Sequence, residues 1–138
     1  MSEAGRSPGR PGPPDRAGLR ILLVEDDRPV ADTLALLLGV DGHRVDIAAD
    51  GVEALERLQQ GSYDVILCDV RMPRLDGPGL YARVLAECPE LAPRIGFVTA
   101  TYDEPTTQEF FARTGVPWIE KPAALDDLRR LLDRLTSR

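Results

Sequence analysis

The feature that most constrains the fold is an apolar run at residues 65–68, which leads directly into Asp69 and then into a loop containing Pro73 and Gly77. Such a run is typical of a strand that is buried on both faces, as in a parallel sheet. Asp69 then lies where this strand ends and the loop begins. Because ligands of open α/β sheets bind outside the carboxyl ends of the strands, Asp69 is either a site residue or an ordinary solvated aspartate.

The chain contains five strand-like runs, and each is followed by a segment with helical periodicity. Apolar residues three and four positions apart give these segments one buried face. Pro29 suits a first helical position, and Asp50 with Glu53 forms a variant of the capping box. We therefore predict strands at residues 20–24, 44–48, 65–68, 94–98 and 116–119, and helices at residues 29–39, 51–60, 77–88, 105–113 and 125–135.

The alternation of strands and helices predicts the fold class, an α/β protein with a doubly wound parallel sheet. Helices cover both faces of such a sheet, and the crossovers are right-handed. We expect five strands in the order 2-1-3-4-5 with five helices, a flavodoxin-like arrangement whose crevice lies between strands 1 and 3. Residues 19–138 would form this single domain, whereas residues 1–18, mainly Gly, Pro, Ser and Arg, would form a disordered tail.

Composition and charge argue against a nucleic-acid-binding or membrane protein. The net charge is −6, so nucleic acid is not an expected partner. No apolar run approaches the roughly 20 residues that a membrane helix needs, and no secretory signal pattern opens the chain. Cys68 and Cys88 lack metal-binding spacing, so we expect reduced packing residues in a cytoplasmic protein. His43 follows a turn and is expected at the surface, far from the acidic residues.

Charged and hydroxyl side chains follow four of the predicted strands, at the same edge of the sheet. In chain order, these residues are Glu25, Asp26, Asp69, Thr99 and Lys121. Lys121 is also the only lysine among 17 basic residues, and its compact ammonium differs from the planar fork of arginine. The single lysine is therefore either a requirement of a site at this edge or a matter of chance.

Three carboxylates close together at this edge would repel one another. Two unit charges about 4 Å apart cost on the order of 4 kcal/mol at an effective dielectric of 20. Either some of the acids are protonated or a cation lies among them, and oxygen ligands suit Mg²⁺. A Mg²⁺ ion, a lysine and a hydroxyl around one aspartate are the groups that phosphoryl transfer requires, with Asp69 as the nucleophile.

Four motifs at the strand ends together resemble the receiver domain of bacterial two-component response regulators, the CheY-like superfamily. The motifs are Glu25-Asp26, Asp69 with Met72-Pro73 and Asp76-Gly77, Thr99-Ala100, and Lys121-Pro122. Each motif is weak alone, but their order and spacing match over residues 19–135, nearly the whole predicted domain. The resemblance implies a phosphoacceptor that takes part in its own phosphorylation and dephosphorylation, and not an enzyme with a separate substrate.

The resemblance also implies how the acidic residues would work. Asp69 would accept a phosphoryl group from a histidine kinase or a phosphotransfer protein and become an aspartyl phosphate. Asp26, Asp69 and the backbone carbonyl of Arg71 would bind Mg²⁺ directly, and Glu25 would assist through water. The side chain of Arg71 and that of Thr101 lie beside the site, where their analogues tune hydrolysis of the aspartyl phosphate.

Three residues would transmit phosphorylation to the surface. A phosphoryl group adds roughly −1.5 to −2 charge. Lys121 would pair with its oxygens, Thr99 would hydrogen-bond it, and Trp118 is either an aromatic switch or a fixed packing residue. The signal would reach the face formed by helix 4, strand 5 and helix 5. An unidentified downstream protein would bind this face, which is also a candidate homodimer surface.

Other functions remain to be weighed against the phosphoacceptor. A receiver-like domain that is never phosphorylated would act only as a protein-interaction module, although the main acidic, hydroxyl and lysine positions are all present. A Mg²⁺ phosphohydrolase is disfavoured because Arg71 stands where a general acid would be expected. A flavin-binding fold is disfavoured because no strand end carries a phosphate-binding loop. Few residues follow the last helix, so we expect a single-domain regulator or a receiver from a larger protein, such as a hybrid kinase.

Overall fold

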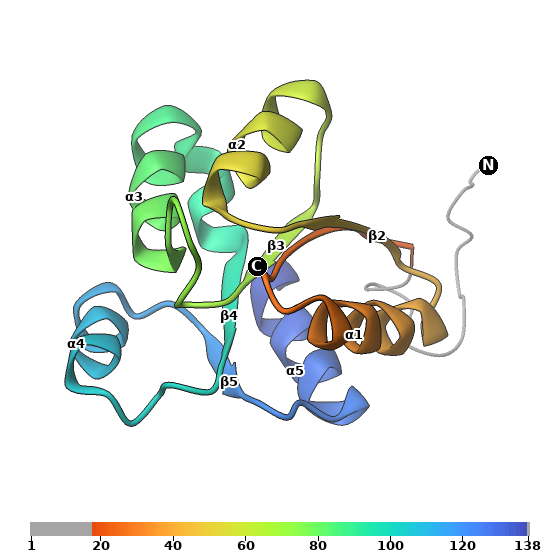
Figure 1. The fold of residues 1–138 in the computed structure, drawn as a ribbon. Helices are drawn as coiled ribbons and strands as arrows, with labels where there is room; N and C mark the ends of the chain where they lie inside the picture. The colour runs from red at the N-terminus through yellow and green to blue at the C-terminus, as the bar shows by residue number, and fades with distance from the viewer. Residues whose placement is uncertain (1–17, 138) are drawn as a thin grey trace.

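The computed structural model describes residues 18–137 and contains a five-stranded parallel sheet in the order β2-β1-β3-β4-β5 (Figure 1). The strands are β1 (Arg20–Val24), β2 (Arg44–Ala48), β3 (Val65–Cys68), β4 (Ile95–Thr99) and β5 (Trp118–Glu120). The predicted fold class and strand order are confirmed. Because β1 pairs with β2 on one side and with β3 on the other, the winding of the sheet reverses between β1 and β3, where a ligand crevice is expected.

Within the described residues, five α-helices alternate with the strands. They are α1 (Arg28–Val40), α2 (Gly51–Gln60), α3 (Gly77–Glu87), α4 (Pro105–Thr114) and α5 (Leu125–Thr136). The first three begin after an aspartate whose carboxylate accepts a hydrogen bond from the backbone amide three residues later, and these caps are Asp27, Asp50 and Asp76. The sequence predicts all five helices to within a few residues of the observed bounds.

Several boundaries differ from the sequence prediction by one residue, and the two larger differences involve proline. A 3₁₀ helix, Pro89–Arg94, lies between α3 and β4, where the sequence prediction contains no helix. Strand β5 begins at Trp118 and not at residue 116. Pro117 has no N–H to donate to the strand ladder, although its carbonyl accepts a hydrogen bond from the amide of Phe97 at 3.0 Å.

The sheet is buried between two layers of helices (Figure 1). Helices α1 and α5 pack on one face, where they meet Ile21 and Leu23 of β1, whereas α2, α3 and α4 pack on the other face, where they meet Leu22 and Val24. Successive side chains of a strand point to opposite faces, so an entirely apolar strand supplies both cores at once. This explains why the central strand β3 is a continuous apolar run rather than an alternating one.

The expectation that His43 lies at the surface is wrong. His43 is buried just before β2, and its Nδ1 accepts a hydrogen bond from the backbone amide of Leu19 at 3.2 Å. The strands begin at this edge of the sheet, which we call the amino edge, so His43 is at the opposite end from Asp69. The histidine accepts the hydrogen bond of a backbone amide, a role that local sequence patterns do not reveal.

The predicted disordered tail, apart from Gly18, lies outside the described residues. Among residues 18–137, none of the helices combines the length and the apolar character needed to cross a bilayer. Cys68 is buried and Cys88 is partly buried, and both are free thiols.

Candidate functional site

The three predicted acids meet at the edge where the strands end, which we call the carboxyl edge. The pairing of Val24 with Cys68 places the residues that follow β1 beside Asp69, whose amide donates to the carbonyl of Val24 at 3.0 Å. Carboxylate oxygens of Glu25, Asp26 and Asp69 lie within 4.8 Å of one another. The strand register therefore brings together acids that are more than forty residues apart in the sequence.

Lys121 reaches the same cluster from β5. Its Nζ donates to Oε1 of Glu25 at 2.5 Å and to Oδ2 of Asp69 at 3.0 Å. The lysine side chain is only 15% exposed, and its backbone amide donates to the carbonyl of Thr99 at 2.9 Å. The single lysine of the chain thus neutralises part of the acidic cluster, as its position after the last strand predicts.

Burial and charge shift the pKa values of this cluster. The Glu25 side chain is 2% exposed, and this burial, together with the nearby charge of Asp69, raises its pKa although Lys121 opposes the shift. Burial alone would lower the pKa of Lys121, but the hydrogen bonds and charges of Glu25 and Asp69 outweigh it and raise the pKa. Lys121 is therefore held as an ammonium, while Glu25 is a carboxylate whose ionised form is disfavoured.

The carboxylate of Glu25 is held on both sides. Its Oε2 accepts a hydrogen bond from the amide of Asp27 at 3.2 Å, while Oε1 faces Lys121. Asp27 itself caps α1 through the amide of Val30 at 3.3 Å. Asp27 thus lies just outside the acidic pair and caps α1, and an aspartate two residues before Pro29 is a recognisable sequence signal for such a cap.

The donor set fits a magnesium ion. Three carboxylates and one ammonium leave excess negative charge in a crevice whose potential ligands are all oxygen atoms. Such a set, with room for water, suits Mg²⁺ better than softer metals. Asp26 and Asp69, with the backbone carbonyl of Arg71, are the residues that would hold the ion, and Glu25 is the buried acid behind them.

Thr99 is buried at the end of β4, and its hydroxyl faces its own loop. The Oγ1 of Thr99 accepts a hydrogen bond from the amide of Thr101 at 3.0 Å and lies 3.0 Å from the Thr101 hydroxyl. The Thr101 hydroxyl lies 3.3 Å from that of Thr107, a buried residue of α4. A chain of three hydroxyl groups therefore connects the strand end with α4.

Trp118 lies between two other rings. Its ring stacks on Phe111 of α4 with a centroid distance of 4.9 Å, and on Tyr102 of the β4–α4 loop with a distance of 5.7 Å. A hydrogen bond to Glu120 raises the pKa of the Tyr102 hydroxyl. The sequence predicts an aromatic side chain at this surface but misses both of its ring partners, which come from other elements.

Arg71 follows the acidic cluster in the loop after β3, but its side chain points toward α4. The guanidinium donates to Glu104, the residue that precedes α4. Only the backbone of Arg71 is thus available to the metal-binding cluster in this arrangement. The ion pair fixes one side of the loop to α4.

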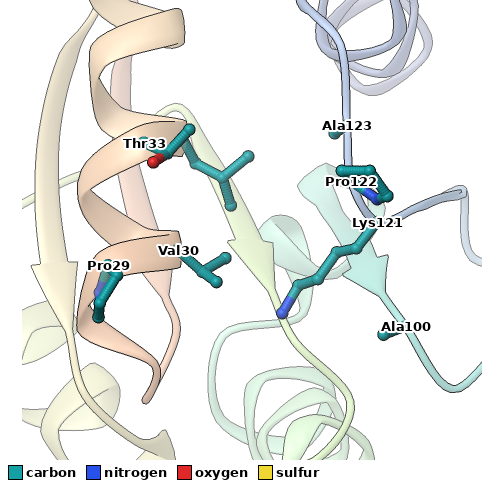
Figure 2. Close-up of a pocket in the computed structure, with 8 residues that line it drawn as sticks. Pro29, Val30, Thr33, Ala100, Lys121, Pro122 and Ala123 are labelled. Atoms are coloured by element: carbon teal, nitrogen blue, oxygen red, sulfur yellow. The ribbon is translucent and has the colours of Figure 1, made fainter.

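A groove opens beside Lys121, between the first turns of α1 and the loop after β5 (Figure 2). Its volume is about 480 Å³ and its walls are mainly apolar; the lining residues are Pro29, Val30, Thr33, Leu34, Ala100, Lys121, Pro122 and Ala123. Ala123 is one of the lining residues, and its small side chain leaves this space open. The groove leads to the ammonium of Lys121 and therefore to Asp69.

Comparison with known proteins now identifies the family. The family model of the response regulator receiver domain matches residues 21–133. This chain belongs to the response regulator receiver domain family. Members act as phosphoacceptors in two-component systems and bind Mg²⁺ at an acidic site, and the matched segment includes all the acidic, hydroxyl and lysine residues described above.

The similar proteins are bacterial regulators and receiver domains. The response regulator MprA of Mycobacterium ulcerans is 49% identical over 59 residues, which cover 43% of this chain and 25% of MprA. The regulatory protein DltR of Streptococcus agalactiae is 34% identical over 113 residues, covering 80% of this chain and 48% of DltR. The chain thus spans a quarter to a half of the length of these relatives.

A solved structure gives a close match in three dimensions. The receiver domain of the sensor histidine kinase PA1611 from Pseudomonas aeruginosa, whose crystal structure has a magnesium ion in the active-site cleft, is 33% identical to this chain. The TM-score is 0.77, and the match covers 88% of this chain and all of that domain, 100%. The fold of this chain is thus that of a receiver domain throughout the described β1 to α5 region.

Proposed function

We propose that this domain is a phosphoacceptor switch of a two-component phosphorelay. The oxygen of Asp69 attacks the phosphorus of a phosphohistidine, and an aspartyl phosphate forms as the phosphorus–nitrogen bond breaks. The electron pair of that bond goes to the imidazole, which takes up a proton. The observation that carries the proposal is the contact of Lys121 Nζ with Asp69 at 3.0 Å, within a cluster of three acids.

The residues of the cluster would divide the work of charge neutralisation. A bound Mg²⁺ would supply positive charge to the transferred phosphoryl oxygens. Lys121 already donates to Asp69, so a short movement would bring its ammonium to the phosphoryl oxygens. Asp26 and Asp69 would hold the metal, and Glu25 keeps Lys121 in place through its buried carboxylate. Water later attacks the phosphorus, which releases phosphate and restores the Asp69 carboxylate.

The phosphodonor would be the phosphohistidine of a kinase or phosphotransfer protein that approaches over the groove beside Lys121 (Figure 2). Any donor must bring its phosphorus to Asp69, and the groove shares Lys121 with that residue. Its apolar walls would receive an apolar side chain of the donor, since Ala123 leaves the space open. We also propose a cytoplasmic location, where such kinases present their phosphohistidine.

Phosphorylation would be transmitted through the β4–α4 loop. Thr99 would turn from Thr101 toward the new phosphoryl oxygens, because a charged acceptor binds a hydroxyl more strongly than a neutral one. This rotation of the Thr99 side chain would break the chain of hydroxyl groups to Thr107. It would also shift Tyr102, which stacks on Trp118. The face formed by α4, β5 and α5 would change, and a downstream protein or a second copy would bind it.

Mass spectrometry after incubation with Mg²⁺ and phosphoramidate, a small phosphodonor, tests the proposal. The parent should gain one phosphate that is lost on standing, and Asp69→Asn should gain none. Asp76→Asn is the matched control, because Asp76 caps α3 in the same loop and asparagine keeps the capping oxygen. A phosphate on neither protein, with no Mg²⁺-dependent change of Trp118 fluorescence, would favour a protein-interaction module instead.

A further inference from the structure

Asp50 and Arg74 form an ion pair between the cap of α2 and the loop after β3, and the proposed chemistry does not use it. The guanidinium of Arg74 donates twice, from Nε to Oδ2 of Asp50 at 2.8 Å and from Nη2 to Oδ1 at 3.2 Å. Asp50 Oδ1 also accepts the amide of Glu53 at 2.9 Å and so caps α2. The Asp50 side chain is 9% exposed, so one buried carboxylate serves both the helix and the loop.

The backbone of Arg74 is strained. Its φ is +67°, and among residues 18–137 it is the only residue other than glycine with a positive φ. An arginine side chain crowds its own backbone in this left-handed conformation, which glycine and asparagine adopt more readily. A strained residue persists when its surroundings hold it, and here the Asp50 carboxylate holds the side chain from a different element.

The loop around Arg74 also fits closely against the start of α2. The amide of Gly51 donates to the carbonyl of Leu75 at 3.0 Å, and a Cβ at Gly51 would come within 2.4 Å of that carbonyl. The amide of Gly77 closes the other end of the loop on the carbonyl of Val70 at 2.8 Å. The loop is thus attached to α2 at its middle, and Arg71 attaches it to α4 through Glu104.

We propose that the Asp50–Arg74 ion pair positions the loop after β3 for metal binding. The inference rests on the proposed function, because the carbonyl of Arg71 in this loop is the expected backbone ligand of Mg²⁺. Because the buried Asp50 carboxylate holds Arg74 and the Gly77 amide holds the carbonyl of Val70, the intervening backbone has little freedom to turn the carbonyl of residue 71 away from the acidic cluster. Asp50 and Arg74 are therefore positioning residues that touch neither metal nor phosphoryl group.

Loss of the ion pair should appear as weaker Mg²⁺ binding. A ligand binds only the fraction of molecules whose site is arranged correctly, so the apparent dissociation constant rises as this fraction falls. Once Mg²⁺ saturates the site, the loop is in place and the rate of phosphorylation should be close to that of the parent. A purely structural role would instead lower stability without a selective change in Mg²⁺ affinity.

Two variants separate the ion pair from the backbone strain. Arg74→Gly removes the guanidinium and also the strain, since glycine adopts a φ of this sign readily. Asp50→Asn keeps a capping oxygen for the amide of Glu53 but removes the charge that faces Arg74. Arg129→Ala is the matched control: Arg129 donates to Asp41 with two distances of 2.8 Å, and this carboxylate is 8% exposed.

The test is the Mg²⁺ dissociation constant, measured by titration calorimetry below the unfolding temperature of each variant. Both Arg74→Gly and Asp50→Asn should weaken Mg²⁺ binding by about threefold to tenfold, while Arg129→Ala stays within about twofold of the parent. A parental affinity in Arg74→Gly, or an equal loss in Arg129→Ala, would overturn the inference. Failure of the parent itself to bind Mg²⁺ would instead remove the proposed function, and with it this inference.

Discussion

At the amino edge of the sheet, Asp41 faces the guanidinium of Arg129, with two distances of 2.8 Å, whereas at the carboxyl edge Glu25 and Asp69 share the ammonium of Lys121. In the first arrangement both oxygens of a buried acid accept hydrogen bonds from one arginine, which also lies 3.5 Å from the exposed Asp126. The second places three carboxylates around one ammonium, so net negative charge remains. A fully paired buried acid suits a stabilising contact, while the excess negative charge suits a site that binds a cation.

This contrast recurs in the pKa shifts of two buried acids that both lie near the carboxyl edge. Arg74 donates to Asp50 and lowers the pKa of that carboxyl, so its charge is stabilised by the fold. Burial and the charge of Asp69 raise the pKa of Glu25 despite its contact with Lys121. Burial is the largest cause of the shift at Glu25, whereas the hydrogen bond from Arg74 is the largest cause at Asp50, so the balance of burial and pairing decides whether each charge is favoured.

The largest effect should come from removing the lysine that contacts the acidic cluster at the carboxyl edge. In Lys121→Ala we expect Asp69 to be phosphorylated at least in part, because Mg²⁺ can still neutralise the phosphoryl group. The Trp118 fluorescence change on phosphorylation should be lost completely, since no ammonium draws the phosphoryl oxygens toward the β4–α4 loop. Intact mass and fluorescence measured on the same sample check both expectations.

Arg129→Ala is the control for Lys121→Ala, because it removes a cation that contacts a buried carboxylate at the other edge. This variant should keep both the phosphate and the fluorescence response. A normal fluorescence response in Lys121→Ala would show that the role assigned to this lysine is wrong. If both variants lost the fluorescence response, its cause would be a general loss of stability and not a change at the candidate site.

A smaller effect, this time on stability, is expected from Asp41→Asn. The change removes the charge that accepts two hydrogen bonds from Arg129, and Asp41 is buried at the C-terminal end of α1. Hydrogen bonds to charged groups contribute about 1.5–3 kcal/mol, so we expect the free energy of unfolding to fall by about 2 kcal/mol. Urea unfolding measures this change, and phosphorylation of Asp69 should stay unchanged.

Asp32→Asn provides the matched comparison on the same helix. Asp32 also pairs with an arginine, Arg28, at 2.9 Å, but both side chains are exposed. Exposed ion pairs contribute no more than about 1 kcal/mol, so this variant should change the free energy of unfolding by about 0.5 kcal/mol or less. If both variants lost the same free energy of unfolding, the buried Asp41–Arg129 pair would be no more stabilising than the exposed Asp32–Arg28 pair, and the expectation would be wrong.

The sequence predicts the fold and the composition of the candidate site because both depend on local patterns. Apolar runs such as Val65–Cys68 define strands that are buried on both faces, and each strand end is marked by the polar residue that follows it. Once the strand order is known, Asp69 and Lys121 must lie at one edge. Topology therefore predicts that these two residues share an edge, whereas their contact across the intervening strand β4 depends also on the conformation of the lysine side chain.

The side-chain pairs that position the site could not be predicted in this way. Asp50 and Arg74 are 24 residues apart and Asp41 and Arg129 are 88 residues apart, and no periodicity connects them. The hydrogen bond from the amide of Leu19 to the buried His43 likewise joins residues that are 24 positions apart. Such pairs are set by how helices and loops pack on the sheet, which the sequence encodes only through the whole fold.

The smallest effect, with the opposite sign, should come from Glu25→Gln at the carboxyl edge. Glutamine keeps an oxygen for Lys121 and removes a charge that burial and Asp69 disfavour. Without Mg²⁺, this variant should therefore be slightly more stable than the parent near neutral pH. The gain in free energy of unfolding should be smaller than the loss expected for Asp41→Asn. Thermal unfolding in the presence of a chelator checks the sign, and a destabilised Glu25→Gln would contradict the contrast between the two edges.

The stability of the parent and of Glu25→Gln should also depend differently on pH. The raised pKa of Glu25 means that the folded protein binds more protons than the unfolded chain at pH values above the ordinary value of 4.5. Stability is therefore lost as pH rises through this window and regained as pH falls, and the variant lacks this slope. Asp50 acts oppositely and at lower pH, since its lowered pKa makes stability fall below the ordinary value of 3.8. At saturating Mg²⁺ the parent should be more stable than Glu25→Gln, because the positive charge of the ion makes an ionised Glu25 favourable.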